Sequence, residues 1–324
     1  MLIMLIMLIT YCLYGFKNEY CDFNNSHIRY DIKFKNLEKK YYENNSSIIK
    51  NGESYYVYTR ISNYSDITYP IIRAFYWLYC DVLKVDKYHN LLGVTQYDNN
   101  FDIISQNIYH PNIKNKNLSI EDLRAFKMYK NIYFIGIAKN NIEKKCYPVI
   151  LDQYYNIYDI VNSKNGSLYY GDKNLVLIGE NTGLIIKTHN PLDILIIKSK
   201  TDHILVDTYF QGKYDKNIPN FRGSTNYLSL EKNKYIGIAH CVDSRLIYKN
   251  YTHYFIILVV RDDGYVYIDK VSVPICFTGN CGVEFIMGLE ETFDKDNYII
   301  TLGKNDSSSH MIVVNKNIVL SYVT

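Results

Sequence analysis

From Ser54 onward the chain alternates between short apolar runs and breaks rich in Asn, Asp, Gly and Lys. The runs have strand length and contain many β-branched and aromatic residues, which favours β-strands. They lie at 55–60, 132–138, 175–179, 184–187, 194–197, 235–240, 254–260, 265–268, 298–302 and 311–314. Since no segment shows a sustained apolar stripe at helical spacing, the pattern predicts an all-β fold and disfavours a parallel βαβ architecture.

Three Asn-Gly or Asp-Gly pairs predict tight turns, at Asn51-Gly52, Asn165-Gly166 and Asp263-Gly264. Such pairs supply the positive φ angles that hairpin turns require. The last pair separates two clear strand patterns, so we predict a β-hairpin there. The arrangement of strands is compatible with a sandwich, a barrel or a propeller.

A loose repeat favours the propeller. Five apolar runs end on a polar or charged residue, and these residues are Arg60, Lys139, His189, His240 and Asp306. They recur every several tens of residues, the spacing of propeller blades rather than of sandwich strands. In a five-bladed β-propeller, strand ends from distant parts of the chain would be gathered at one central channel. The spacing is uneven and no Trp-Asp blade motif marks it, so periodicity alone leaves the other two architectures open.

The composition excludes some classes of partner but does not indicate a function. The 324 residues include 35 Tyr but one Trp, and Tyr favours half-buried strand surfaces. Asn, Lys, Ile and Tyr all have AT-rich codons, so the bias also fits the genome of an AT-rich source, viral or protist. The net charge of +3 is too small to indicate a nucleic-acid partner.

Residues 1–16 form an almost unbroken apolar leader. It is shorter than a membrane-spanning helix and has the length of a signal-peptide core, although a positive flank is missing. A signal peptide predicts secretion or the secretory pathway; a short anchor, a buried first strand or a translation artefact are the alternatives, and without a signal the chain would be cytoplasmic. We predict an irregular or partly extended segment at 17–46 and the propeller domain at 47–324, with no later membrane span.

Cysteine usage fits either compartment. Beyond the leader lie Cys21, Cys80, Cys146, Cys241, Cys276 and Cys281. An even set in a secreted chain permits disulfides, and Cys276–Cys281 is the expected local pair because Gly279-Asn280 would form the turn between them. No CxxC pair and no His/Cys cluster has zinc spacing, so we expect no metal. Asn-x-Ser/Thr sequons occur, but an Asn-rich chain produces them by chance.

The segment Ser119–Phe126 carries the best candidate chemistry. Cleavage of a glycosidic bond needs a protonated carboxyl group near the leaving oxygen and a second group on the opposite face. Glu121 and Asp122 beside Arg124 could supply an acid and an anchoring ion pair. The same residues also fit a capped helical turn that begins at Ser119.

This segment, followed by 132–138, resembles the Glu-Asp-Pro-Arg segment of glycoside hydrolase family 130, the β-mannoside phosphorylases and mannosidases. The resemblance extends from about residue 47 to 320. Similar segments lie at 47–60, 172–174, 221–225 with 235–240, and 283–289 with 298–306. Members of this family are five-bladed propellers, so the resemblance implies that fold for this chain.

The resemblance implies a role for each matching residue. Asp122 would be the general acid, and Glu284 would activate water in a hydrolytic member. Arg60, Glu121, Arg124 and Asp306 would contact the sugar. Lys173, Arg222 and His240 would hold inorganic phosphate as a co-substrate, with Arg60 also able to contribute. The partner would be an oligosaccharide or a sugar phosphate, and no cofactor would be needed.

Several residues depart from the family pattern and keep other readings open. Leu123 replaces the motif's Pro, Ser-Thr-Asn follows Gly223, and His253-Tyr254 differs from the usual Tyr-Arg pairing. The chain can therefore be a phosphorylase, a hydrolase or a transferase. It can also be a secreted propeller that binds glycans or proteins without turnover, or a structural surface glycoprotein. His240 also fits a hydrogen-bonded core residue, and Glu284 an ion pair with an arginine.

Overall fold

The computed structural model describes most of the chain beyond the leader. The described residues are 21–22, 27–35, 37–39, 41–63, 90–110, 118–140, 145–162, 166–167, 173–243, 250–277 and 284–323. The predicted signal peptide at 1–16 lies outside them. So does Cys281, which leaves the expected Cys276–Cys281 pair undescribed.

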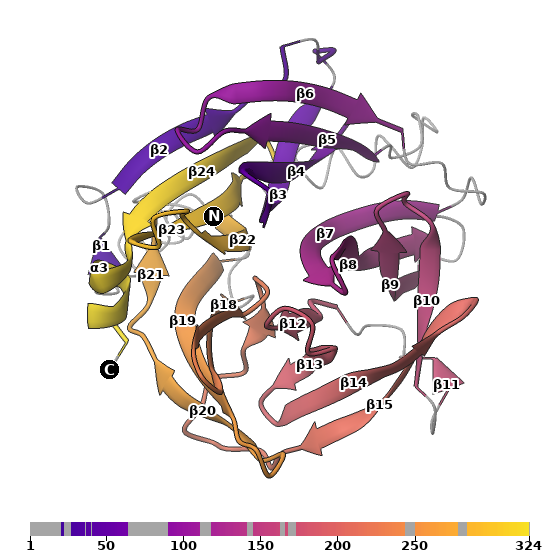
Figure 1. Cartoon of the computed structure of the whole chain (residues 1–324), viewed down its shortest axis with the longest axis vertical. Helices are drawn as coiled ribbons and strands as arrows, with labels where there is room; N and C mark the ends of the chain where they lie inside the picture. Colours follow the sequence, from indigo (N-terminus) through magenta and orange to yellow (C-terminus); the bar gives the residue numbers. More distant parts are fainter. Residues whose placement is uncertain are drawn as a thin grey trace, which may run out of the picture.

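The described strands form antiparallel sheets grouped around a centre (Figure 1). One sheet has the order β3-β4-β5-β6 and contains β3 (Tyr42–Asn51), β4 (Ser54–Ser62), β5 (Asn90–Tyr97) and β6 (Ile103–Tyr109). Another has the order β2-β24-β23-β22 and contains β2 (His27–Ile32), β22 (Glu284–Glu291), β23 (Asn297–Lys304) and β24 (Ser308–Asn315). The helix α3 (Lys316–Ser321) follows β24.

A nine-stranded sheet consists of two meanders joined by a parallel pairing of β10 with β15. The first meander contains β7 (Leu118–Met128), β8 (Asn131–Asn140), β9 (Lys145–Asp152) and β10 (Ile157–Asn162), with β11 (Gly166–Ser167) beside β10. The second contains β12 (Val176–Ile178), β13 (Leu184–His189), β14 (Leu192–Lys200) and β15 (His203–Gln211).

The remaining sheet has the path β1-β21-β19-β18-β16, with β17 on β18 and β20 on β19. Its strands are β1 (Cys21–Asp22), β16 (Arg222–Gly223), β17 (Leu228–Glu231), β18 (Lys234–Asp243), β19 (Asn250–Val260), β20 (Val266–Val271) and β21 (Ile275–Cys276). The predicted hairpins at Asn51-Gly52 and Asp263-Gly264 are confirmed, since β3 pairs with β4 and β19 with β20 across them.

The repeated apolar runs become the second strand of each meander, namely β4, β8, β13, β18 and β23. The innermost strands are others: β3, β7, β12 and β22 lie toward the centre in Figure 1. The second strands pack between neighbouring sheets, whereas the inner strands β3, β7 and β22 carry buried polar residues such as Asn45, Arg124 and Glu284.

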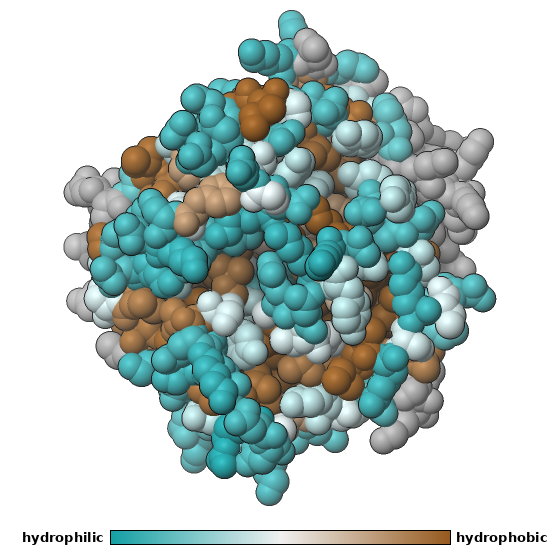
Figure 2. All heavy atoms as spheres, in the orientation of Figure 1, coloured by the Kyte–Doolittle hydropathy of each residue, from teal (hydrophilic) through white to brown (hydrophobic). Residues whose placement is uncertain are grey.

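The core lies between adjacent sheets. Phe255 of β19 and Ile300 of β23, both fully buried, share one cluster, and the other clusters also join residues of successive meanders. The sheets thus pack face to face, and each contact removes apolar surface from water. On the face shown in Figure 2, hydrophilic side chains predominate, with hydrophobic patches between them.

The first part of the chain closes the last sheet. β2 pairs with β24 in regular antiparallel register from His27↔Val314 to Ile32↔Ser309. Both β2 and the start of β3 lie within 17–46, for which the sequence predicted irregular or partly extended structure. This pairing joins an early segment of the chain to β24 and covers the edge that β24 would otherwise expose. No helix in the described part of the chain has the length and hydrophobicity to cross a bilayer.

Candidate functional site

Asp122 lies on a β-bulge in β7. The register of β7 against β8 shifts between Glu121 and Arg124, and Asp122 has a φ of 54°. A bulge redirects side chains relative to a regular strand. Asp tolerates a left-handed backbone better than most residues, but the conformation still costs about 1 kcal/mol or more. Residues held in such conformations often belong to functional sites.

The Asp122 carboxylate is held by residues from two other strands. Its Oδ1 accepts a hydrogen bond from Asn45 Nδ2 of β3 at 3.0 Å and one from Arg60 Nη1 of β4 at 3.3 Å. Neither contact involves Oδ2, and no donor among the described residues forms a hydrogen bond with that oxygen. One carboxylate oxygen is therefore held by Asn45 and Arg60, and these two contacts do not involve the other.

Arg60 connects both carboxyl groups of the motif. Its Nη2 lies 3.4 Å from Glu121 Oε1, and the side chains of Arg60, Glu121 and Asp122 are 11%, 17% and 18% exposed. Burial lowers the pKa of Arg60, but the negative charges of Glu121, Asp122 and Asp306 outweigh it and raise the pKa overall. Asp306 is thus close enough to belong to the same charged group.

Arg124 has a different role from Arg60. It is 1% exposed, and its donors reach main-chain oxygens instead of a carboxylate: Nε to Ser224 O at 2.6 Å, Nη1 to Asp122 O at 3.1 Å and Nη2 to Gly223 O at 3.3 Å. Burial lowers its pKa to about 10, although the Asp122 charge opposes this shift. Arg124 therefore ties the backbone of the bulge to the 223–224 segment across the centre.

The cavity beside Asp122 is small. It has a volume of about 20 Å³ and is lined by Asn45, Tyr58, Arg60, Asn90, Leu91, Leu92, Ile120, Asp122 and Leu123. That volume holds about one water molecule. A sugar would have to bind outside it, over the surface that Arg60 and Asp122 present.

The residues expected to bind phosphate differ in their exposure. Lys173 and Arg222 are exposed. Arg222 pairs in register with His240 across β16 and β18. His240 is 1% exposed, and its Nδ1 lies 2.8 Å from Ser224 Oγ. Burial, together with His253 and the arginines Arg124 and Arg222, lowers the pKa of His240 well below its ordinary value. His240 is thus a neutral, hydrogen-bonded side chain at physiological pH.

Glu284 is also enclosed. It is 1% exposed, and its Oε1 accepts a hydrogen bond from the Phe277 backbone N–H at 3.1 Å. Its neighbour in sequence, Phe285, stacks edge-on against His240 with ring centroids 5.1 Å apart. A carboxylate that activates water must reach solvent or substrate. Its burial and its contact with Phe277 place Glu284 inside packed protein at the start of β22 rather than at an open surface.

Sequence reasoning missed the asparagines that organise this site. Asn45 holds Asp122, while Asn90 accepts from Arg60 Nε at 3.3 Å and donates to the Ile120 carbonyl at 3.1 Å. Asn174 Oδ1 lies 3.4 Å from Arg124 Nη2. The available signal was the run Asn44-Asn45-Ser46-Ser47 immediately before Ile48, a polar stretch that is buried in β3.

The comparisons with known proteins bear on the fold. No protein-family model matches the sequence, and no curated protein matches it. Among solved structures, a glycosyl hydrolase from Bacteroides ovatus is similar with a TM-score of 0.59 and 11% identity, covering 85% of each chain. A β-1,2-mannobiose phosphorylase from Listeria innocua is similar with a TM-score of 0.56 and 9% identity, covering 90% of this chain and 95% of that one.

A third similar structure is a mannose phosphorylase from Leishmania mexicana in complex with a phosphate ion. Its TM-score is 0.51 at 10% identity, and the match covers 93% of this chain and 92% of that one. At such identities the likeness establishes the fold. The chain is a propeller-type β protein whose structural neighbours are carbohydrate-active enzymes.

Proposed function

We propose that this protein is a carbohydrate-active enzyme that acts on mannoside-like glycosidic bonds, with Asp122 as its general acid, on a propeller of five blades. Each meander described above is taken as one blade. The observation that carries the proposal is the Asp122 bulge. A strained, nearly buried aspartate with one oxygen fixed by Asn45 and Arg60 is arranged to present the other oxygen to a bound molecule.

In the proposed reaction, Asp122 in its protonated form gives a proton to the glycosidic oxygen while the bond between that oxygen and the anomeric carbon breaks. An oxygen nucleophile forms the new bond to the anomeric carbon. The mannose phosphorylase neighbours support phosphate as that nucleophile. The burial of Glu284 leaves water without the carboxylate expected to activate it, so phosphate is tested first, with water and a sugar hydroxyl beside it.

The remaining charged residues would bind the sugar. Arg60, Glu121 and Asp306 form one charged group around Asp122, and carboxylates and guanidinium groups are suited to hydrogen bonds with hydroxyls. Arg124 would act through the backbone as a positioning residue, because it holds Asp122 O and the 223–224 segment.

The test is incubation with β-linked manno-oligosaccharides, with and without inorganic phosphate, and of mannose 1-phosphate with mannose as acceptor. Mannose 1-phosphate as product identifies phosphorolysis, free mannose identifies hydrolysis, and a longer oligosaccharide identifies transfer. We expect Asp122→Asn to lower the rate by about 10²–10⁴-fold, the usual contribution of a positioned general acid.

Asp159→Asn is the matched control, because Asp159 is an exposed aspartate on β10. It should leave the rate unchanged. Wild-type protein that folds but turns over none of these substrates would overturn the proposal and favour the alternative, a propeller that binds glycans without cleaving them. Equal rates for wild type and Asp122→Asn would exclude Asp122 as the acid.

A further inference from the structure

A much larger cavity lies at the other end of the inner strands. It has a volume of about 630 Å³, within the usual range for ligand pockets. Along β3, Asn45 contacts Asp122 while Lys50 lines this cavity; along β7, Asp122 is followed by Ala125 and Lys127, which also line it. We call the two regions the Asp122 end and the Lys50 end. The two cavities share no lining residue.

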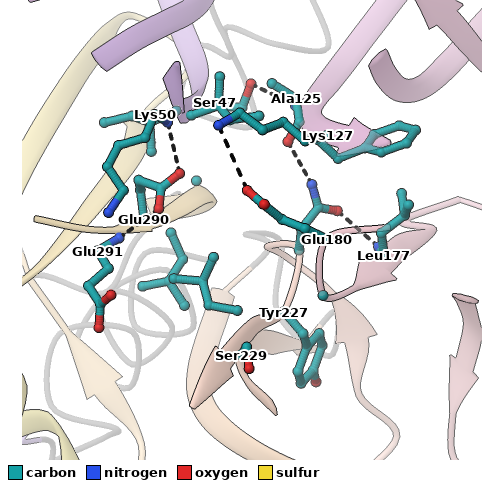
Figure 3. A pocket seen from close by; sticks show the side chains of 18 of the residues that line it. Ser47, Lys50, Ala125, Lys127, Leu177, Glu180, Tyr227, Ser229, Glu290 and Glu291 are labelled. Carbon is teal, nitrogen blue, oxygen red and sulfur yellow. Dashed lines mark hydrogen bonds and ion pairs between the residues drawn. The ribbon is translucent and has the colours of Figure 1, made fainter. Parts of the chain in front are cut away.

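A chain of hydrogen bonds links several residues in the wall of the Lys50 cavity (Figure 3). The Ala125 N–H donates to Ser47 Oγ at 3.2 Å, and Asn226 Nδ2 donates to Ala125 O at 2.8 Å. The Leu177 N–H in turn donates to Asn226 Oδ1 at 2.9 Å. Residues of β3, β7 and β12 are thus linked in one wall of the cavity, and Asp122 is not among the residues that line it.

The charges that line the cavity are balanced. Three lysines, Lys50, Lys127 and Lys295, face three glutamates, Glu180, Glu290 and Glu291. Glu290 is committed to the fold, because its oxygens accept the Lys50 and Glu291 backbone N–H groups, each at 2.9 Å. Because the lysines and glutamates of the lining carry no net formal charge, we expect a neutral ligand to fit better than an anion or a cation.

Two features suit a molecule with many hydroxyls. Lys127 Nζ and Glu180 Oε1 approach each other only to 3.9 Å, and Glu180 is 61% exposed. A hydroxyl placed between them could accept from the ammonium and donate to the carboxylate. Phe293, which also lines the cavity, is 38% exposed although its ring contacts Tyr55 and Lys50, and the exposed part of an aromatic ring can pack against the apolar face of a sugar ring.

We propose that the Lys50 end is a second carbohydrate-binding site, which takes a short neutral oligosaccharide and performs no chemistry. The choice of a saccharide rests in part on the proposed function. The position of the site, its separation from Asp122 and its preference for a neutral ligand rest on the geometry of the cavity.

The experiment measures binding of neutral manno-, xylo- and cello-oligosaccharides of about two to four units to the Asp122→Asn protein, so that turnover does not interfere. Saturation-transfer NMR and titration calorimetry report the affinity. We expect Ser229→Trp to weaken binding at least tenfold. Ser229 is an exposed residue that lines the cavity, so a Trp there fills space without entering the core.

Ser199→Trp is the control, since Ser199 is an exposed strand serine that lines neither cavity. It should bind like the parent. Glucose 6-phosphate serves as an anionic probe and should bind this site more weakly than the neutral sugars. The inference is overturned if no neutral probe binds at millimolar concentration, if Ser229→Trp binds as well as Ser199→Trp, or if the anion binds more tightly.

These outcomes separate the inference from the proposed function. Turnover that depends on Asp122, together with binding that ignores Ser229→Trp, would retain the enzyme and reject the second site. Binding that Ser229→Trp abolishes, in a wild-type protein without turnover, would retain the site and reject the enzyme. Ser229→Trp should also leave any turnover at the Asp122 end unchanged at saturating substrate.

Discussion

The two ends of the centre are built from the same inner strands but handle charge in opposite ways. At the Asp122 end, Arg60, Glu121 and Asp122 have side chains less than 20% exposed and are in mutual contact around a cavity of about 20 Å³. At the Lys50 end, Lys127 and Glu180 form a loose pair at the rim of a cavity of about 630 Å³. The first arrangement holds a carboxylate in a defined position, whereas the second surrounds a large open volume.

The contrast has an energetic consequence. Removing one partner of a buried ion pair strongly destabilises a protein, because the remaining charge is left uncompensated. Exposed ion pairs contribute about 0–1 kcal/mol. Substitutions at the Asp122 end should therefore lower the free energy of unfolding far more than substitutions at the Lys50 end, and the following predictions test that difference in order of expected size.

Arg124→Met should have the largest effect. The substitution removes a buried guanidinium and leaves the Ser224, Gly223 and Asp122 carbonyls without their donor. We expect a loss of about 3–5 kcal/mol in the free energy of unfolding, measured by urea denaturation. Arg261→Met is the control, since Arg261 forms an exposed ion pair with Asp263 and should cost less than about 1 kcal/mol. Similar losses for the two variants would contradict the contrast between buried and exposed charge.

Acid should destabilise the protein through histidines near both ends. Burial lowers the pKa of His189 to about 4 and that of His253 to about 3. His189 bonds to Tyr227 OH at 2.9 Å, and Tyr227 lines the Lys50 cavity, while His253 Nε2 accepts from the Ile286 backbone N–H at 3.3 Å near the start of β22. Acid sensitivity is therefore one property that the ends share.

The direction in which stability changes with pH follows from proton binding. In the unfolded chain these histidines have a pKa near 6.5, so below that pH the unfolded state binds more protons than the folded state. The stability they contribute is present above pH 6.5 and is lost as the pH falls toward the folded pKa. We expect each histidine to lower the free energy of unfolding by about 2 kcal/mol between pH 7 and pH 5. Urea denaturation at several pH values should show a slope that His189→Gln reduces; an unchanged slope would contradict the assignment.

Gly136→Ala should disturb the Asp122 bulge directly. A Cβ at Gly136 would lie 2.8 Å from Leu123 Cδ2 and 2.9 Å from Glu121 O, so the bulge would have to move. We expect a cost of about 1–2 kcal/mol from overpacking, and a loss of activity because Asp122 is displaced. Gly52→Ala is the counterpart at the Lys50 end: its Cβ meets nothing within 4 Å, although its φ is +60°. That variant should keep full activity, and a comparable loss of activity in both variants would contradict the prediction.

The sequence predicted the strands well where apolar residues mark the packing of a strand in the core. The second strands β4, β8, β13, β18 and β23 were visible as apolar runs because neighbouring sheets bury both of their faces. It was less informative for strands that line the centre. Residues 44–46 of β3 are buried yet entirely polar, so a pattern that equates burial with apolar residues left them in the segment predicted to be irregular or partly extended.

The candidate site shows the same limit. The resemblance of residues 120–126 to a known motif drew attention to Asp122, and the apolar run ending at Arg60 identified its cation. Nothing in the local pattern indicated that Asn45 and Asn90 would hold the same group, because their contacts join strands 29 to 77 residues apart. For Lys173 and Arg222, residue type suggested phosphate binding, but exposure depends on neighbours that only the fold supplies.

Glu180→Gln should have the smallest effect and tests the Lys50 end at its rim. The substitution removes one charge from a pair whose nitrogen and oxygen are 3.9 Å apart and whose carboxylate is mostly exposed. We expect the free energy of unfolding to change by less than about 0.5 kcal/mol, because solvent screens the interaction and a mobile side chain loses entropy when held. Thermal and urea denaturation at low and high salt would measure it. A loss above about 1 kcal/mol, or one that salt does not reduce, would mean that charge at the Lys50 end is as firmly interlocked as at the Asp122 end.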